Sequence, residues 1–160
     1  MKTIKIEAEL EVYDSIDELP QDIQSLMVAA IKARDDAYAP YSKFKVGAAI
    51  LLDNDKVVTG SNQENASYPS GLCAERTAIY YASSKYPAVP ISRIAITAGS
   101  LKHLTDTPIP PCGACRQAIS EYEIQQNKPI EIYFMGSKGK VVKAKSLSDL
   151  LPLAFNKSVL

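Results

Sequence analysis

The sequence predicts an α/β fold in which one globular domain, residues 20–160, follows a short N-terminal extension, residues 1–19. Stretches in which apolar and polar residues alternate, as in half-buried strands, occur between stretches in which apolar residues recur at helical spacing. The chain has 160 residues, of which 46% are hydrophobic and 22% are charged. This length and composition are typical of a single domain with a substantial core.

The extension is expected to form an added edge strand. Charged residues alternate there with an apolar set that would share one face of an extended chain: Ile4, Ile6, Ala8, Leu10 and Val12. Next, Pro20 opens a helix whose apolar residues lie on one face. This helix is expected to run to about Tyr38, because Pro40 cannot continue it.

The remaining elements are strands and helices in alternation. One helix is expected to begin near Cys73, after a polar loop, and another near Cys112, after a proline-rich loop. A short helix over residues 147–155 is expected to end the domain. The strands around these helices form two hairpins and one single strand, over residues 46–52, 56–61, 93–98, 131–135 and 140–145.

Charge and composition exclude several classes of partner. Lysine plus arginine equals aspartate plus glutamate, at 18 each, and no basic run is long enough to follow a phosphate backbone. We therefore expect no nucleic-acid partner. The N-terminus lacks the apolar core of a secretory signal, and no apolar run reaches membrane-spanning length. These features favour a cytoplasmic protein without a membrane partner.

All three cysteines of the chain fall in one pattern. Glu75 follows Cys73 by two residues, and Cys112 and Cys115 are three residues apart. Three thiolates can hold a tetrahedral Zn²⁺ and leave its fourth position for water, whose proton a nearby carboxylate can take. An odd number of cysteines in a cytosolic chain also favours a metal site over a disulfide framework. The pattern predicts one zinc ion per subunit, with Glu75 as catalytic acid and base.

Both halves of this predicted site lie at helix N-termini, where free backbone N–H groups and the helix dipole stabilise thiolates. Three thiolates leave a zinc site with net negative charge. Arg76 is expected to hydrogen-bond them and draw charge off sulfur. The alternative is a closed structural zinc site with the only histidine, His103, as fourth ligand, which leaves the position of Glu75 unexplained.

With these motifs the chain resembles the small, homotetrameric, zinc-dependent cytidine deaminases of the cytidine/deoxycytidylate deaminase superfamily. In deaminases of this kind the glutamate is not a zinc ligand. The resemblance extends from Gln21 to Phe155. It rests on four blocks and a weaker fifth: Tyr38–Phe44 continuing into Val46–Ala49, Asn62–Tyr68, Cys73–Ala78, Pro111–Gln117, and Leu150–Pro152 with Ala154–Phe155.

The resemblance implies a three-layer α/β/α fold, in which helices cover both faces of a mixed five-stranded sheet. It implies that residues 20–160 are a catalytic domain acting on small-molecule pyrimidine nucleosides, with active sites shared between the subunits of a homotetramer. It also implies substrate contacts. Asn62 and Glu64 would bind the ribose 3′-hydroxyl, Phe44 would line the nucleoside pocket, and Phe155 would stack on the base in a neighbouring subunit's site. Two further contacts are expected from Tyr68 and Ala74.

The implied reaction is the hydrolysis of cytidine and 2′-deoxycytidine to uridine and 2′-deoxyuridine, with release of ammonia, in pyrimidine salvage. Zinc lowers the pKa of its bound water, and Glu75 takes the proton. The hydroxide attacks C4 of cytosine while Glu75 protonates N3, and Glu75 then passes a second proton to the departing amine.

Three rival functions remain open from the sequence. Blasticidin-type deaminases also carry three cysteines and the cysteine–glutamate pair, but resemble this chain less at Asn62–Asn65. Deaminases of tRNA or single-stranded DNA usually place histidine at the position of Cys73 and present a basic surface. A non-catalytic zinc-binding protein on the same fold is the third, and the intact Glu75 argues against it.

Overall fold

A single mixed sheet of six strands forms the centre of the computed structural model, which describes residues 1–157 and 160. Neighbouring strands are antiparallel except β4 and β5, which are parallel. In spatial order the strands are β1 (Leu10–Tyr13), β6 (Val141–Ala144), β5 (Glu131–Met135), β4 (Ile91–Ser100), β2 (Phe44–Leu52) and β3 (Val57–Ser61). The sheet thus comprises the five expected strands and an added N-terminal one at its edge.

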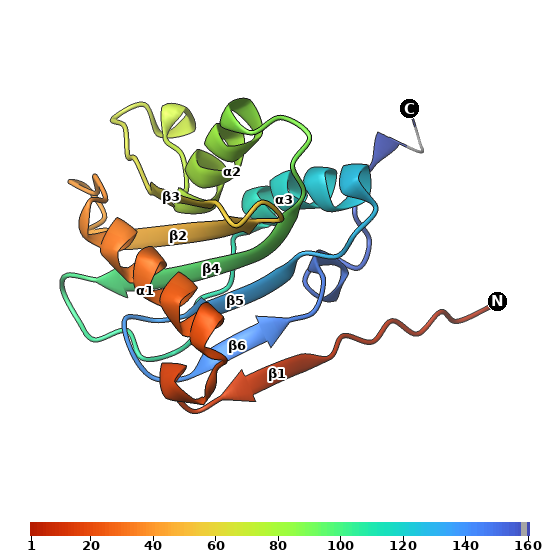
Figure 1. Cartoon of the computed structure of the whole chain (residues 1–160), viewed down its shortest axis with the longest axis horizontal. Coiled ribbons are helices and arrows are strands. Elements are labelled where there is room, and N and C mark those ends of the chain that lie inside the picture. Colours follow the sequence, from red (N-terminus) through yellow and green to blue (C-terminus); the bar gives the residue numbers. More distant parts are fainter. Residues whose placement is uncertain (158–159) are drawn as a thin grey trace.

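Helices cover both faces of this sheet (Figure 1). Helix α1 (Gln21–Asp35) packs on one face through Ile23, Leu26 and Met27, which contact apolar residues of the central strands. Helices α2 (Ala74–Lys85) and α3 (Gly113–Gln126) lie on the other face, over a larger apolar cluster. The predicted three-layer α/β/α arrangement is confirmed. Among the described residues, no helix is long and apolar enough to cross a membrane.

The central strands are buried on both faces because helices cover both sides. In β4, residues Ile94 to Gly99 are all buried, and β2 is buried from Gly47 to Ile50. Small residues in β2 and β3 let the helices approach closely. A Cβ atom on Gly60 would lie 2.6 Å from the backbone nitrogen of Ala78 and 2.7 Å from the carbonyl oxygen of Ala74. This close approach fixes the position of the first turn of α2, where the cysteine motif begins.

Two predicted boundaries were wrong by three residues or more. The N-terminal strand covers Leu10–Tyr13 rather than beginning at Ile4, because β6 offers it only four partner residues. Helix α1 ends at Asp35, before the expected Tyr38, whose backbone N–H instead donates to the carbonyl of Asn62 at 3.0 Å.

The expected helix over residues 147–155 is also wrong. Only one turn of 3₁₀ helix forms there, at Leu147–Asp149. Pro152 has no backbone N–H to give to a helix, and the residue before a proline avoids helical geometry. The segment after this turn therefore runs without regular structure to Asn156.

Candidate active site and metal centre

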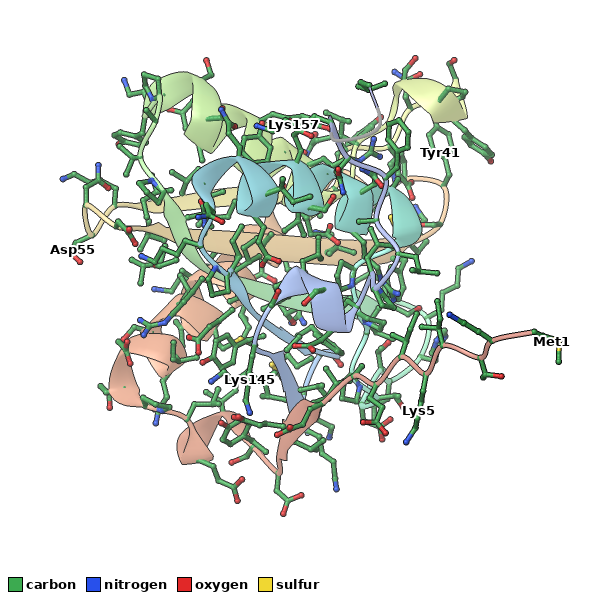
Figure 2. The ribbon with its side chains drawn as sticks, turned by 90° about the vertical axis from the view of Figure 1, so that its right-hand side faces the viewer. Met1, Lys5, Tyr41, Asp55, Lys145 and Lys157 are labelled. Carbon is green, nitrogen blue, oxygen red and sulfur yellow. The ribbon has the colours of Figure 1, made fainter. Side chains whose placement is uncertain are left out.

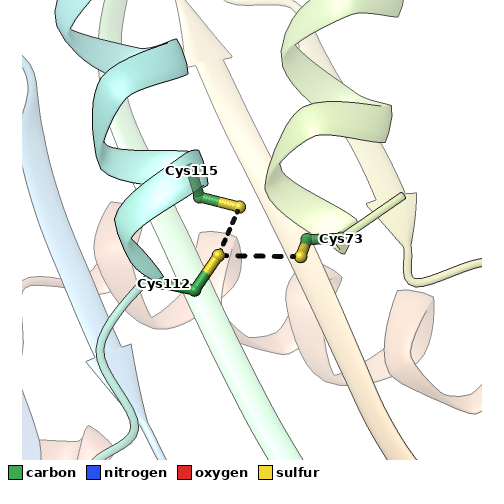
Figure 3. A group of neighbouring side chains, drawn as sticks. All are labelled: Cys73, Cys112 and Cys115. Carbon is green, nitrogen blue, oxygen red and sulfur yellow. Dashed lines mark hydrogen bonds between the residues drawn. The ribbon is translucent and has the colours of Figure 1, made fainter. Parts of the chain in front are cut away.

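Two helix N-termini meet on the α2 and α3 face of the sheet and bring the three cysteines together (Figure 3). Cys73 is the N-cap residue of α2, and Cys112 is the N-cap residue of α3. Cys115 lies one turn into α3 and is fully buried. Neither N-cap thiol accepts a capping hydrogen bond from a backbone N–H of its own helix. The capping thiols are thus free to bind another group.

The spacing of the three sulfur atoms fits a tetrahedral metal ion. The Sγ atoms of Cys73 and Cys112 are 3.8 Å apart, and those of Cys112 and Cys115 are 3.5 Å apart. All three lie within 4.8 Å of one another. Zn–S bonds of about 2.3 Å at tetrahedral angles place sulfur atoms roughly 3.8 Å apart. These residues fit zinc, and the exposed His103 is not part of the described ligand group.

The electrostatics of the cluster favour a thiolate. Hydrogen bonding from the Cys115 thiol and from Arg76 lowers the pKa of Cys73 to about 5. The same interaction with Cys73, together with burial, raises the pKa of Cys115. The cluster therefore favours negative charge on Cys73 over negative charge on Cys115. A divalent cation is the group that stabilises all three thiolates at once.

Arg76 lies where the sequence predicts it, beside the thiols. Its Nη2 atom is 3.9 Å from the Sγ of Cys73, and this contact raises the pKa of the guanidinium. The Nε atom of Arg76 is buried and has no hydrogen-bond partner among the described residues. A guanidinium in this place offsets part of the negative charge of the thiolates.

Glu75 is only 4% exposed, on the first turn of α2. Burial raises the pKa of its carboxyl, and the neighbouring Cys73 thiolate raises it further. A carboxyl with a raised pKa can hold a proton closer to neutral pH than an exposed one, which suits a group that accepts and returns protons.

A cavity of about 700 Å³ opens beside the cysteine cluster. This volume is in the range of pockets that hold a small ligand. Most of the predicted site residues line it. They are Phe44, Asn62, Glu64, Tyr68, Cys73, Glu75, Arg76 and Cys112.

The predicted ribose-binding pair lies at the cavity wall, and both side chains also hold the backbone. Asn62 accepts a hydrogen bond from Val46 N at 2.7 Å and donates one to Phe44 O at 3.0 Å. Glu64 accepts from the backbone N–H groups of Tyr41 and Ser42 and from the Ser42 hydroxyl. The Ser42 hydroxyl is the main cause that lowers the pKa of Glu64.

Two predicted contacts do not line the cavity of their own chain. Ala74 is fully buried in the apolar cluster beneath α2. Phe155 is 60% exposed in the C-terminal segment, where its carbonyl oxygen accepts a hydrogen bond from Gln117. Their roles in substrate binding stay predictions.

Sequence reasoning missed several residues of the cavity wall. Ile96 and Ala98 come from β4, and Ile109 and Pro110 come from the loop before Cys112. The loop residues are next to the motif, which is a usable signal. Nothing in the sequence around Ile96 and Ala98 predicts that they line a cavity, because their place depends on the order of the strands in the sheet.

Comparison with known proteins agrees with this site. The sequence model described as "Cytidine and deoxycytidylate deaminase zinc-binding region" matches residues 20–128, which include all three cysteines. A cytidine deaminase of Halalkalibacterium halodurans is 41% identical over 136 residues, covering 84% of this chain and 94% of that protein. One from Sporosarcina psychrophila is 39% identical over 136 residues, covering 85% and 93%.

A solved structure shows the same likeness in three dimensions. The cytidine deaminase of Burkholderia pseudomallei superimposes with a TM-score of 0.72 at 40% identity, covering 86% of this chain and all of that one. The fold, the three-cysteine cluster with its buried glutamate, and these similarities lead to one conclusion: the chain belongs to the cytidine and deoxycytidylate deaminase family.

Proposed function

We propose that this protein hydrolyses cytidine and 2′-deoxycytidine to the corresponding uracil nucleosides and ammonia, as an enzyme of pyrimidine salvage. The observation that carries the proposal is the buried carboxyl of Glu75 beside three clustered thiols, in a cavity large enough for a nucleoside. Relatives that carry the name cytidine deaminase support the choice of substrate.

Cys73, Cys112 and Cys115 would hold the zinc ion. When bound, it supplies a Lewis acid that makes water acidic at neutral pH. Among the described residues, no fourth metal-binding side chain joins the three cysteines, so a bound zinc ion would be left accessible to water. Arg76 contacts the Cys73 thiolate and limits the negative charge that would otherwise weaken the Lewis acid.

Glu75 moves the protons of the reaction. Its carboxylate takes a proton from water and delivers it to N3 of cytosine, which makes C4 more electrophilic. A C4–O bond forms as water adds. Glu75 then carries the second proton to the exocyclic amine, the C4–N bond breaks, and ammonia leaves. The raised pKa of Glu75 suits this alternation between its two protonation states.

Glu64 and Asn62 bind the ribose at the cavity wall in this proposal, and Phe44 and Tyr68 enclose the nucleoside. Glu64 is exposed enough to reach a ligand while Ser42 holds its orientation. A hydrogen-bonded sugar hydroxyl separates a nucleoside from a free base strongly, because its loss leaves buried polar groups unpaired.

We also infer that the protein works as a homotetramer in the cytoplasm. Exposed aromatic side chains support subunit contacts, among them Tyr38, Tyr41, Tyr68, Tyr81 and Phe155. Three free cysteines support a reducing compartment. Sedimentation at micromolar concentration tests the assembly. A fully active monomer would rule out both the tetramer and the shared role of Phe155.

The deciding experiment is conversion of cytidine to uridine, followed by ultraviolet absorbance, for wild type and Glu75→Gln at matched zinc content. We expect Glu75→Gln to lose about 10²- to 10⁴-fold in kcat while it retains zinc. Glu121→Gln, a change at an exposed glutamate of α3, is the matched control and stays active. Equal turnover by Glu75→Gln would rule out its role, and an inactive zinc-loaded wild type would rule out the proposed substrate.

A further inference from the structure

The N-terminal segment contains more strand-forming sequence than the rest of the chain can pair. Apolar residues alternate with charged ones from Ile4 to Val12, but only Leu10–Tyr13 pairs with β6. Residues 1–9 are all exposed and run away from the body of the molecule (Figures 1 and 2). The match to the deaminase family begins only at residue 20, after this segment.

Beside β6, the acidic side chains of the N-terminal strand form ion pairs with lysines of β6 or of the residue that follows it. Glu11 pairs with Lys143 at 3.7 Å and with Lys145 at 3.4 Å, and Glu9 pairs with Lys145 at 3.0 Å. Beyond Glu9, the pattern of charges continues with Glu7 and Lys5, which contact only each other among the described ion pairs. The alternation of charges therefore indicates that residues 1–9 can pair with a further strand.

The apolar side of this segment is also uncovered. In an antiparallel pair, directly opposite residues share a face, and Leu10 and Val12 lie opposite Ala144 and Val142 of the larger core cluster. Both are nevertheless exposed, at 42% and 59%, and further out Ile4 and Ile6 are exposed at 86% and 48%. β1 is the last strand of the sheet, so its outer edge is open as well.

We propose that residues 2–10 pair antiparallel with the same residues of a second copy of this chain, with Ile6 opposite Ile6. In this register Lys5 of each copy lies opposite Glu7 of the other, so two oppositely charged pairs form on one face. On the other face, Ile4 lies opposite Ala8 and the two Ile6 side chains meet. The inference does not rest on the proposed function.

The charges exclude the neighbouring arrangements. In one adjacent register Glu7 would face Glu7, and in the other Lys5 would face Lys5, which is destabilising in directly opposite positions. Parallel in-register pairing would align every charge with its own kind. A shift by a single residue would set apolar side chains opposite charged ones. The proposed register alone pairs Lys5 with Glu7, opposes no like charges and keeps Ile4, Ile6 and Ala8 opposite one another; only at its ends does it set a charge, Lys2, opposite an apolar residue, Leu10.

Covalent trapping tests this register, because a two-stranded contact of nine residues is small for a stable interface. The probe is Ile6→Cys in the full-length, zinc-loaded protein, exposed to oxidised glutathione and run on a denaturing, non-reducing gel. We expect a band of two chains, since residues directly opposite each other bring their Cβ atoms close enough for a disulfide. Wild type, whose three cysteines all belong to the metal cluster, gives the background.

Ile4→Cys and Ala8→Cys are the matched controls. In the proposed register the two copies of each cysteine are about four residues apart along the strand, roughly 13 Å. Neither variant should therefore form the disulfide-linked dimer efficiently. Equal trapping at all three positions, or none at Ile6→Cys, would overturn the proposal.

Charge reversal provides a second readout. Adding Lys5→Glu or Glu7→Lys to Ile6→Cys should slow trapping several-fold, and the combined exchange Lys5→Glu/Glu7→Lys should restore it. If the combined exchange traps no faster than the single changes, the register is wrong. Cytidine turnover is measured in parallel: a protein that traps as expected but is inactive would contradict the proposed function and leave this inference standing.

Discussion

The Gln117 Nε2 atom donates a hydrogen bond of 2.8 Å to the carbonyl oxygen of Phe155. The preceding residue, Arg116, donates from Nη1 to the carbonyl oxygen of Leu150 at 2.9 Å. Both donors follow Cys115 directly on α3. The helix that begins at Cys112 and carries Cys115 therefore also holds the C-terminal segment in place.

Loss of this anchor should weaken nucleoside binding without loss of zinc. If Phe155 stacks on the base in a neighbouring site, Gln117→Ala should raise the KM for cytidine about twofold to tenfold, the value of one hydrogen bond, at nearly unchanged kcat. Steady-state kinetics with zinc analysis measures both effects. Gln125→Ala, an exposed glutamine on the same helix, should leave KM unchanged.

The link to Phe155 is tested by a double-mutant cycle. Phe155→Ala should raise KM more than Gln117→Ala does, and adding Gln117→Ala to it should change little more, because the anchored ring is already gone. Fully additive effects would mean that Gln117 acts on substrate binding by a different route.

Asn62 is expected to contribute to stability as well as to sugar binding. Its amide joins Phe44 O and Val46 N at the start of β2, and both backbone groups would lose their partner in Asn62→Ala. We expect the free energy of unfolding to fall by about 1–3 kcal/mol in urea denaturation. Gln63→Ala removes one exposed hydrogen bond to the Ser61 hydroxyl and should cost less than about 0.5 kcal/mol. A normal unfolding curve with a raised KM would mean that Asn62 serves the ligand alone.

The parts of the fold that the sequence predicted correctly are those that local signals decide. The cysteine–glutamate pattern and the capping positions of Cys73 and Cys112 need only helix spacing and loop composition. The length of the N-terminal strand depends instead on β6, which is too short to pair with residues before Leu10. No signal within residues 1–9 carries that information.

In the candidate site, too, residues within contiguous motifs could be predicted and residues brought in by tertiary structure could not. Residues of the motifs were predicted because each motif is contiguous in sequence. Ile96 and Ala98 were missed because they enter the cavity through the strand order, which places β4 next to β2. The backbone contacts of Glu64 in the loop before β2, and of Asn62 at the start of β2, also depend on tertiary contact between residues 16 to 23 apart.

The Glu131 carboxylate should make the protein more stable at neutral than at acidic pH. Burial alone would raise the pKa of Glu131, but hydrogen bonds from Lys143 at 2.8 Å and Arg93 at 3.0 Å outweigh it, and the pKa lies below its ordinary value. A lowered folded pKa gives stability that is present above the unfolded value and is lost as pH falls through the folded one. Wild type should thus exceed Glu131→Gln by about 1 kcal/mol at neutral pH, with the difference shrinking below roughly pH 4.

Urea denaturation of wild type and Glu131→Gln across this pH range measures the difference in their free energy of unfolding. Both proteins are used without metal, so that loss of zinc at acidic pH does not contribute. Glu18→Gln, at an exposed glutamate before α1, is the control and should show no comparable pH dependence. A constant gap between wild type and Glu131→Gln at all pH values would contradict the assignment.

Gly60 should support zinc binding although it lies on β3, outside the cysteine motifs. An added Cβ would lie within 2.7 Å of backbone atoms at both Ala74 and Ala78, so Gly60→Ala must push the first turns of α2 away from β3. We expect a loss of about 1–3 kcal/mol in the free energy of unfolding, as for an overpacked core. Zinc affinity should fall too, because Cys73 would move relative to Cys112.

Gly113→Ala is the control: it has no neighbour within 4 Å of its added Cβ and lies on the first turn of α3, where alanine is tolerated. Chemical denaturation and competition with a chromophoric chelator measure the two quantities, and a Gly60→Ala protein that matches Gly113→Ala in both would show that α2 can shift without disturbing the site.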